Sequence, residues 1–208
     1  MNRDLFVTGT DTDVGKTLLS STLVAALQRK YWKPIQTGSS QGTDRERVMR
    51  WAGVGAGETF PESYIFDPPV SPHLAAEKQG TVIELHHLQR PSWHGPLIIE
   101  GAGGLLVPIN GEAFMADVIA HLGAPVIIAV RTALGTINHT LLTIAAARNA
   151  SLTLRGVVMI GKPNADNYRA IERYGHVPVI GSIPWLAKID RETLVSVFQE
   201  HFDRSAFE

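Results

Sequence analysis

The segment from Thr8 to Leu18 reads T-G-T-D-T-D-V-G-K-T-L. It follows the short apolar run Leu5-Phe6-Val7 and opens a segment with apolar residues at helical spacing. A strand, a glycine-bounded loop and a helix that begins at Gly-Lys-Thr are typical of a phosphate-binding loop. Glycines let backbone N–H groups converge on phosphate oxygens, and the new helix points its free N–H groups and positive dipole end at them. The segment therefore predicts that the protein binds a nucleotide.

Two side chains of this loop have predicted roles. Lys16 is expected to reach the terminal phosphates, and Thr17 to offer its hydroxyl to a magnesium ion. The spacing departs from the common pattern, because five residues separate Gly9 from Gly15 and Thr10 stands where the first glycine usually is. The alternative interpretation is a glycine turn with a lysine at the start of a helix.

Length and composition limit the class of protein. A chain of 208 residues with 44% hydrophobic content suits one compact domain, residues 1–208, with a sizeable core. The net charge of -1 predicts no binding to nucleic acid or to an anionic membrane. The absence of cysteine excludes disulfides, thiolate metal sites and a cysteine nucleophile. No signal segment or membrane-spanning apolar run is found, so a cytoplasmic protein is expected.

Strand-like and helix-like segments alternate along the chain. The predicted strands span residues 4–8, 35–37, 96–100, 125–130, 156–160 and 177–180, and the predicted helices span residues 16–28, 44–51, 72–78, 116–122, 138–150 and 165–174. Residues 126–130 are apolar throughout, as in a strand that is buried on both faces. This alternation predicts an α/β three-layer sandwich, with a mostly parallel central sheet between two layers of helices.

Two clusters lie at and after the second predicted strand, residues 35–37. The first, K-P-I-Q-T-G at residues 33–38, places Lys33 where it could face an anion from the side opposite Lys16, with Thr37 as a second donor. Its alternative is a solvated lysine before a proline turn. The second, G-T-D at residues 42–44, places Asp44 at the start of a helix, where an acidic residue is often simply a helix cap.

Two further clusters stand at predicted strand ends, where α/β sheets bind ligands. Glu100 ends a buried strand in L-I-I-E-G-A-G-G at residues 97–104, and a carboxylate there is costly to bury unless it meets a cation or good donors. The alternative is a glycine-rich turn with a partly exposed glutamate. The segment L-G-T-I-N-H at residues 134–139 is a strand-to-helix junction that suits an anion, or else a plain helix start.

Six motifs occur together and in order: G-T-D-T-D-V-G-K-T, K-P-I-Q-T-G, S-P-H-L-A-A, E-G-A-G-G, L-G-T-I-N-H and I-P-W-L. Together they resemble the dethiobiotin synthetase family, from residue 7 to about residue 186. The resemblance implies a P-loop NTPase-like fold, a homodimer, and a cyclo-ligase that uses ATP and Mg2+. Such an enzyme joins CO2 to 7,8-diaminopelargonic acid through a carbamate and a carbamic-phosphoric anhydride, and it closes a cyclic urea.

The resemblance also implies roles for individual residues. The residues implied in catalysis are Lys33 and Lys16. Those implied in binding the diamine or carbamate are Thr12 and Thr37, and those implied in holding magnesium are Thr17, Asp44 and Glu100. The distal carboxylate of the diamine is expected at Gly135, Thr136, Ile137 and Asn138, contributed by the neighbouring subunit. The nucleotide is expected to contact Asp13, Val14, Gly15, Lys16, Thr17, Leu18, Asp44, Glu100, Gly101, Ala102, Gly103, Pro184, Trp185 and Leu186.

The chain departs from the family pattern at two places. The crossover from Lys16 to Lys33 is shorter than usual, which predicts a short second strand. The Asn-Asp pair that commonly reads adenine is absent, and M-I-G-K at residues 159–162 stands there. We therefore expect ATP to be used but other nucleoside triphosphates to be accepted as well, unless Lys162 or Asn164 replaces the missing amide.

The main rival function is a nucleotide-switched interaction ATPase of the partition or septum-site type, which shares the broader fold. Those proteins usually carry an additional lysine early in the loop, where this chain has Thr10 and Asp11. A second rival, the amidotransferase-linked cobyrinate group, has a glutaminase domain that needs a cysteine, and this chain has none.

Overall fold

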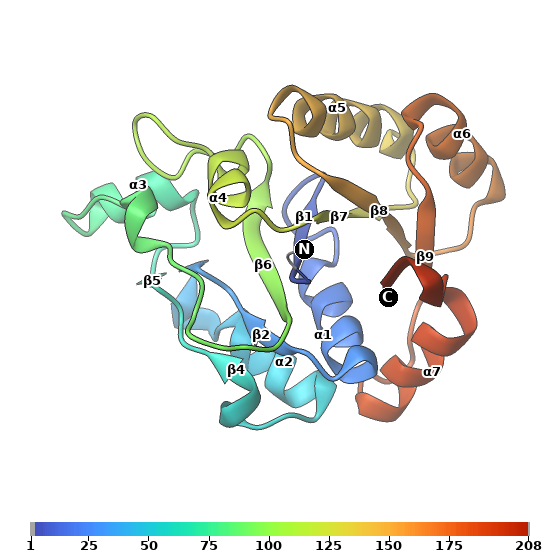
Figure 1. Cartoon of the computed structure of the whole chain (residues 1–208), viewed down its shortest axis with the longest axis horizontal. Helices are drawn as coiled ribbons and strands as arrows, with labels where there is room; N and C mark the ends of the chain where they lie inside the picture. Colours follow the sequence, from blue (N-terminus) through green and yellow to red (C-terminus); the bar gives the residue numbers. More distant parts are fainter. Residues whose placement is uncertain (1–2, 208) are drawn as a thin grey trace.

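The computed structural model describes residues 3–207 and is built around one parallel sheet of seven strands (Figure 1). The strand order across this sheet is β4-β2-β6-β1-β7-β8-β9, and every named pair is parallel. The strands are β1 Leu5–Gly9, β2 Lys30–Trp32, β4 Thr59–Phe60, β6 Leu97–Gly104, β7 Val126–Arg131, β8 Leu154–Ile160 and β9 Val179–Ile183.

Helices cover both faces of the sheet. They are α1 Lys16–Leu27, α2 Asp44–Ala52, α3 Pro72–Lys78, α4 Met115–Leu122, α5 Thr136–Asn149, α6 Ala165–Gly175 and α7 Arg191–His201. Helices α1, α2 and α7 pack together on one face, and α4, α5 and α6 cover the other (Figure 1). The predicted three-layer α/β sandwich is therefore confirmed.

The strand sequences produce these layers because side chains alternate between the two faces of a strand. In β1, Leu5 and Val7 join the apolar core under α1, whereas Phe6 joins the core under the opposite helices. In β7, Ile127 and Ile128 divide in the same way. Central strands that supply apolar residues to both cores must be apolar at consecutive positions, as the sequence of β7 is.

The edge of the sheet beside α2 differs from the sequence prediction. The strand predicted at residues 35–37 forms with the predicted bounds, as β3 Ile35–Thr37, but it pairs with β5 Tyr64–Phe66 in a separate two-stranded sheet. The second strand of the main sheet is instead the three-residue β2, which was not predicted. Its Tyr31 and Trp32 are fully buried because β6 and β4 flank it on both sides. The expectation of a short second strand is thus correct, but its predicted position was wrong.

Helix ends follow the expected chemistry. Thr43 caps α2 with a capping box, in which its hydroxyl accepts from the Glu46 N–H at 3.1 Å and the Glu46 carboxylate accepts from the Thr43 N–H at 2.8 Å. Gly123 ends α4 in the left-handed conformation. Helix α7, missed by the sequence prediction, is capped by Asp190, whose carboxylate accepts from the Thr193 N–H. No helix among residues 3–207 is long and apolar enough to cross a membrane.

Candidate active site

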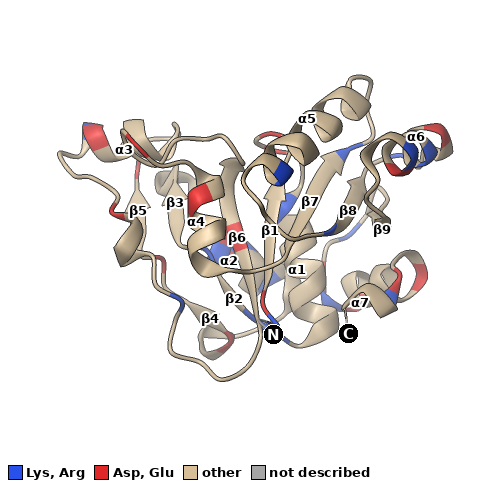
Figure 2. Cartoon of the chain, turned by 45° about the horizontal axis from the view of Figure 1, so that its top comes forward, with Lys and Arg blue, Asp and Glu red and all other residues tan. Residues whose placement is uncertain are grey.

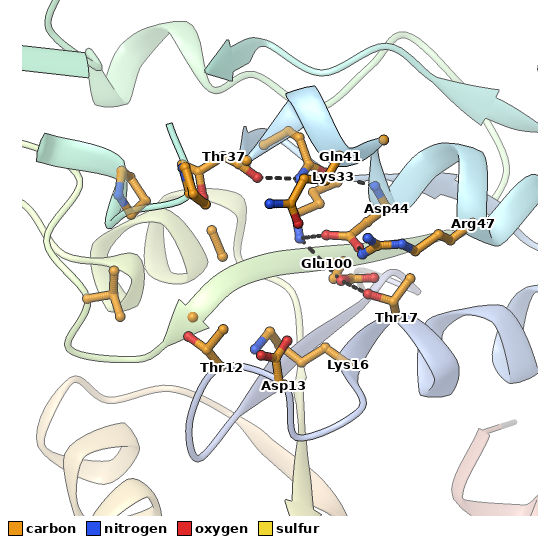
Figure 3. A pocket seen from close by; sticks show the side chains of 18 of the residues that line it. Thr12, Asp13, Lys16, Thr17, Lys33, Thr37, Gln41, Asp44, Arg47 and Glu100 are labelled. Atoms are coloured by element: carbon orange, nitrogen blue, oxygen red, sulfur yellow. Dashed lines mark hydrogen bonds and ion pairs between the residues drawn. The ribbon is translucent and has the colours of Figure 1, made fainter. Parts of the chain in front are cut away.

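A cleft of about 680 Å³ opens where β1 and β6 end, with the loop before α1 on one side and the segment from Lys33 to α2 on the other. Strand β1 lies between β6 and β7, so later strands run to either side of it, and such a point is where α/β sheets bind ligands. Figure 3 shows Lys16 and Thr12 across the cleft from Lys33 and Asp44, with Glu100 between them. The cleft is lined by Thr12, Asp13, Gly15, Lys16, Thr17, Leu18, Lys33, Gln36, Thr37, Gly38, Gln41, Gly42, Asp44, Arg47, Trp51, Pro69, Val70, Ser71, Pro72, Glu100, Ala102, Gly103 and Val107.

The phosphate-binding loop has the geometry that its glycine predicts. Gly15 lies in the left-handed region with φ of 99° immediately before α1, and a Cβ there would stand 2.7 Å from Ile160 Cδ1. Glycine is thus required both for the turn and for the approach of β8. Asp13 also has a positive φ, of 55°. The glycine turn at Gly15 and the start of α1 are both present, and together they form one wall of the cleft.

Lys16 is buried in this wall and folds over its own loop. Its ammonium donates to the backbone carbonyl of Asp11 at 2.8 Å. Burial lowers the pKa of Lys16 although Glu100 opposes the change, and the positive charge of Lys33 acts in the same direction as burial. The two lysines of the prediction therefore influence one another across the cleft, which is the arrangement expected for an anion held between them.

Lys33 lies opposite and is only 4% exposed. Its ammonium is 2.5 Å from Asp44 Oδ2 and 3.3 Å from Glu100 Oε1 (Figure 3). Burial alone would lower the pKa of Lys33, but the Glu100 and Asp44 carboxylates outweigh it and raise the pKa above its ordinary value. Lys33 is therefore a charged group inside the site, and the alternative of a solvated lysine before a proline turn was wrong.

Asp44 is held from three directions. Besides Lys33, Arg47 donates to Asp44 Oδ1 at 2.8 Å, and the Asp44 backbone N–H donates to Gln36 Oε1 at 3.0 Å. Burial opposes ionisation of Asp44, but the nearby cations, Lys33 first, lower its pKa. Because Thr43 caps the helix, the Asp44 side chain is free to face the cleft, and the helix-cap alternative for Asp44 was wrong.

Glu100 is the most buried charge of the site, at 1% exposure. Its Oε1 accepts from the Thr17 hydroxyl at 2.8 Å and from Lys33, and its Oε2 accepts from the Tyr31 hydroxyl at 3.0 Å. A buried carboxylate needs such donors, so the alternative of a glycine-rich turn with a partly exposed glutamate was wrong.

Sequence reasoning missed three members of this network. Tyr31 and Arg47 were not singled out, and Gln36 was quoted in its motif without a role. The spacing of Tyr31 two residues before Lys33 was the available signal, because side chains at that spacing in an extended segment point to one side.

The structure brings only part of the predicted nucleotide set to the cleft. Val14 and Gly101 are buried beside it, and Gly101 packs against Phe6 and Met115 rather than facing the open space. The remaining predicted residues lie outside the cleft of the described chain: Gly135, Thr136, Ile137, Asn138, Pro184, Trp185 and Leu186. Thr136 is tied down by donating its hydroxyl to the carbonyl of Arg131. Contacts of these residues with a ligand stay predictions.

The oxygen donors at the cleft fit a magnesium ion. Thr17, Asp44 and Glu100 gather a hydroxyl and two carboxylates at one point, with the Thr17 hydroxyl hydrogen-bonded to Glu100. Within residues 3–207, no group of three or more His, Cys, Asp or Glu side chains is placed to hold a metal on its own. This donor set suits a cation that keeps several waters and takes its other ligands from phosphates, as Mg2+ does.

Comparisons with known proteins give relatives across the chain. A family model described as an AAA domain matches residues 3–193. The ATP-dependent dethiobiotin synthetase of Rhodopseudomonas palustris (strain HaA2) is 43% identical over 207 residues, which cover 100% of this chain and 97% of that protein. The ATP-dependent dethiobiotin synthetase of Novosphingobium aromaticivorans is 46% identical over 196 residues, which cover 94% of this chain and 95% of that protein.

Solved structures with the same fold are more distant. A ParA family ATPase from Chlorobium tepidum TLS aligns with a TM-score of 0.57 and 12% identity, over 94% of this chain and 90% of that chain. The MinD cell division protein of Aquifex aeolicus aligns with a TM-score of 0.53 and 12% identity, over 92% and 85%. At this identity the likeness shows the fold alone. The two dethiobiotin synthetases match nearly the whole chain at 43% and 46% identity, and the chain therefore belongs to the dethiobiotin synthetase family.

Proposed function

We propose that this protein forms dethiobiotin from 7,8-diaminopelargonic acid and CO2 at the expense of ATP. Membership of the family supports the overall reaction, and the observation that carries it to this chain is the buried pairing of Lys33 with Asp44 and Glu100 opposite Lys16. We also propose that residues 1–208 act as one such domain, in the cytoplasm. The rest of the proposal concerns which residue does what.

The reaction brings two anions together, a carbamate and the γ-phosphate of ATP, and the two lysines supply the positive charge that this requires. One amine of the substrate attacks CO2 and loses a proton, which gives a carbamate. A carbamate oxygen then attacks the γ-phosphorus of ATP and releases ADP, and both reacting groups are negatively charged. Lys16 and Lys33 approach that point from opposite walls, so they stabilise the charge that accumulates during phosphoryl transfer. The second amine then attacks the carbonyl carbon and expels phosphate, which closes the urea ring.

Lys33 is held in place before any substrate binds. Asp44 and Glu100 fix its ammonium and keep it charged, so no reorganisation is needed as the phosphoryl group moves. Thr12 and Thr37 line the same cleft and offer hydroxyl donors to the diamine or its carbamate. No histidine is needed in this scheme, because the amine attacks CO2 as a free base.

We propose that Mg2+ binds with the nucleotide at Thr17, Asp44 and Glu100. Bound there, the ion would neutralise charge on the β- and γ-phosphates. Each of these three residues already contacts a partner on the protein, Thr17 through Glu100 and Asp44 through Lys33. They are therefore oriented in advance, and water can complete the coordination.

We propose that the enzyme is a homodimer that shares its two sites. The diamine carries an acid remote from its amines, and one phosphate loop does not hold both ends. The start of α5, with Gly135 and Asn138 exposed, is the second anion site, yet it lies outside the cleft of its own chain. Leu134, immediately before it, is fully exposed at 107% of its reference area, and Leu142 on the same helix is also exposed. A second copy that covers these leucines would bring its α5 to the cleft.

The base of the nucleotide is proposed to lie beyond Ile160, near Pro184, Trp185 and Leu186. Ile160 touches the phosphate loop at Gly15, so the end of β8 stands on the nucleotide side of the sheet. An isoleucine has no group to pair with a base. Asn164, the nearest amide side chain after β8, uses its oxygen to cap α6 by accepting from the Asn167 N–H at 2.9 Å. We therefore propose that recognition of the base is loose.

One experiment separates this enzyme from a nucleotide-switched ATPase. Purified protein is supplied with ATP and Mg2+, and phosphate release is measured with and without the diamine and bicarbonate. The proposal requires that turnover depend on both and that dethiobiotin accumulate in equal amount to ADP. Figure 2 shows Lys and Arg interspersed with Asp and Glu along the helices and strands, in keeping with the net charge of -1. Hydrolysis of ATP that ignores both substrates would defeat the proposal.

A further inference from the structure

We propose that Tyr31 is a positioning residue for this active site: its hydroxyl holds one oxygen of Glu100, so that the other oxygen faces Thr17 and Lys33. The inference rests on the proposed function and adds a residue to it. It starts from the only tyrosine hydroxyl that meets a carboxylate within the described part of the chain.

The strands place Tyr31 beneath the site. It is paired with Ile98 across β2 and β6, and Glu100 follows two residues further along β6 on the same face. Lys33, the residue directly after β2, also reaches Glu100, at 3.3 Å. The ring is fully buried in the core under α1, and only its hydroxyl reaches the charged network.

The hydrogen bonds of Glu100 divide between its two oxygens. Oε2 accepts from the Tyr31 hydroxyl at 3.0 Å, and Oε1 accepts from Thr17 at 2.8 Å and Lys33 at 3.3 Å. A carboxylate that keeps only the two Oε1 contacts can turn about its terminal bonds, whereas a donor on Oε2 fixes the plane of the group. Tyr31 therefore decides which oxygen is presented to the phosphate and metal side.

The phenol is suited to this role. Its hydroxyl lies 3.0 Å from Glu100 Oε2, and a phenol hydroxyl can either donate or accept a hydrogen bond. It must then donate, because an ionised carboxylate only accepts. Groups that orient metal-binding side chains in this way typically change activity or metal affinity by about 10–100-fold when they are lost.

The test is Tyr31→Phe, which keeps the buried ring and removes the donor. We expect a folded protein whose kcat falls about 10–100-fold and whose Mg2+ requirement for half-maximal turnover rises by a similar factor. Binding of ADP measured by calorimetry with and without Mg2+ gives a readout that needs no turnover, and the gain in ADP affinity from Mg2+ should shrink. The matched control is Tyr168→Phe, which removes a hydroxyl that donates to the Val179 carbonyl, and it should leave kcat and Mg2+ dependence unchanged.

A double-mutant cycle distinguishes positioning from packing. If Tyr31 acts through Glu100, Tyr31→Phe should have no further effect on kcat or Mg2+ dependence in a Glu100→Gln background. Full and independent losses in that background would overturn the proposal, and so would an unchanged Mg2+ dependence in Tyr31→Phe. A variant that loses its fold would assign Tyr31 to the core alone and would also overturn it. Failure of the unmodified protein to make dethiobiotin would contradict the proposed function instead, and the ADP measurement would still decide the role of Tyr31.

Discussion

The carboxyl edge of the sheet has two halves, and they differ in the burial of their side chains and in the partners that those side chains have. In the half formed by β1, β2 and β6, Lys33 directly follows β2 and Glu100 lies within β6. These two residues are 4% and 1% exposed, and each has partners from another element. At the ends of β7 and β9, Leu134 and Trp185 are 107% and 86% exposed. Both halves contain residues of the six family motifs. In the first half, side chains of one chain are joined by hydrogen bonds and ion pairs, whereas in the second half the side chains named are exposed.

The two halves differ in whether their side chains already have partners within the same chain. The inner half, defined as the ends of β1, β2 and β6 with the start of α2, stabilises its own buried charges, because a buried charge without a partner is costly. The outer half, defined as the ends of β7, β8 and β9 with the start of α5, exposes apolar side chains and a helix start. Exposed apolar surface of this kind is typical of regions that bind a ligand or a second chain. Substitutions in the inner half should therefore affect chemistry, and those in the outer half should affect assembly and selectivity.

The largest effect is expected from Lys33→Ala. Removal of an electrostatic contact to the transferring group typically lowers the rate by about 10²–10³-fold. Turnover should fall by that factor while the affinity for ADP changes little, because Lys16 and the loop still hold the phosphates. Steady-state kinetics and calorimetry measure the two quantities separately.

The control for Lys33→Ala is Lys78→Ala, at the exposed end of α3, which should keep normal turnover. Lys33→Ala leaves Asp44 and Glu100 without their shared cation, so its melting temperature is compared with that of the unmodified protein. Near-normal dethiobiotin formation by a folded Lys33→Ala protein would remove Lys33 from the mechanism.

Glu100→Gln should have the next largest effect. The amide keeps the shape of the side chain but loses the charge that faces the metal, and loss of such a group typically costs about 10–100-fold. We expect the Mg2+ concentration for half-maximal turnover to rise, with the far-ultraviolet circular dichroism spectrum unchanged. The neighbouring Glu46→Gln, on the capping box of α2, is the control for loss of one negative charge. Equal Mg2+ dependence in Glu100→Gln and the unmodified protein would show that Glu100 is structural.

The sequence predicted the inner half better than the outer half, for physical reasons. The phosphate loop is local, and its glycine, lysine and threonine follow from one turn and one helix start. Lys33, Asp44 and Glu100 stood at predicted element ends, so their convergence followed from the parallel sheet. Apolar periodicity also predicted most strands and helices within a few residues.

What the sequence did not predict depends on pairing between distant segments. Strand β2 has three residues and begins with Lys30, so it shows no period, and it is a strand because β6 and β4 flank it. The role of Tyr31 depends on that register, since its pairing with Ile98 brings it to the face of β6 that carries Glu100. In the outer half, the partners of residues 135–138 and 184–186 are proposed to be a second chain and a nucleotide. Under that proposal, the contacts of these residues depend on molecules other than the chain that carries them.

The dimer can be tested where the outer half is most exposed. Leu134→Glu places a charge at the proposed interface, and truncation or replacement of a central interface residue commonly weakens association by about tenfold or more. We expect light scattering to show a larger monomer fraction at low concentration, with a raised KM for the diamine and unchanged affinity for ADP. Leu106→Glu, at a leucine that is 65% exposed after the end of β6, tests whether any surface charge has this effect. A fully active monomer of the unmodified protein would defeat the shared-site proposal.

The smallest expected effect concerns the base of the nucleotide, at the boundary between the two halves. Ile160 packs against Gly15 and offers no hydrogen bond, and Asn164 is engaged at the start of α6. Shape alone discriminates among similar ligands by roughly 10–200-fold, far less than a site that pairs with polar groups. We therefore expect GTP and CTP to be used with kcat/KM within about 100-fold of the value for ATP.

Ile160→Asn sharpens this test, because an asparagine amide matches the donor and acceptor on the edge of adenine. One neutral hydrogen bond contributes about 1 kcal/mol, so the preference for ATP over GTP should rise by about fivefold. Ile160→Val keeps an apolar side chain of similar shape against Gly15, and it should leave the ratio as it is in the unmodified protein. The four nucleoside triphosphates are compared by kcat/KM under saturating diamine and bicarbonate.

A strict preference for ATP in the unmodified protein would mean that another residue reads the base. Lys162 is then the first candidate, since it is exposed directly after the end of β8.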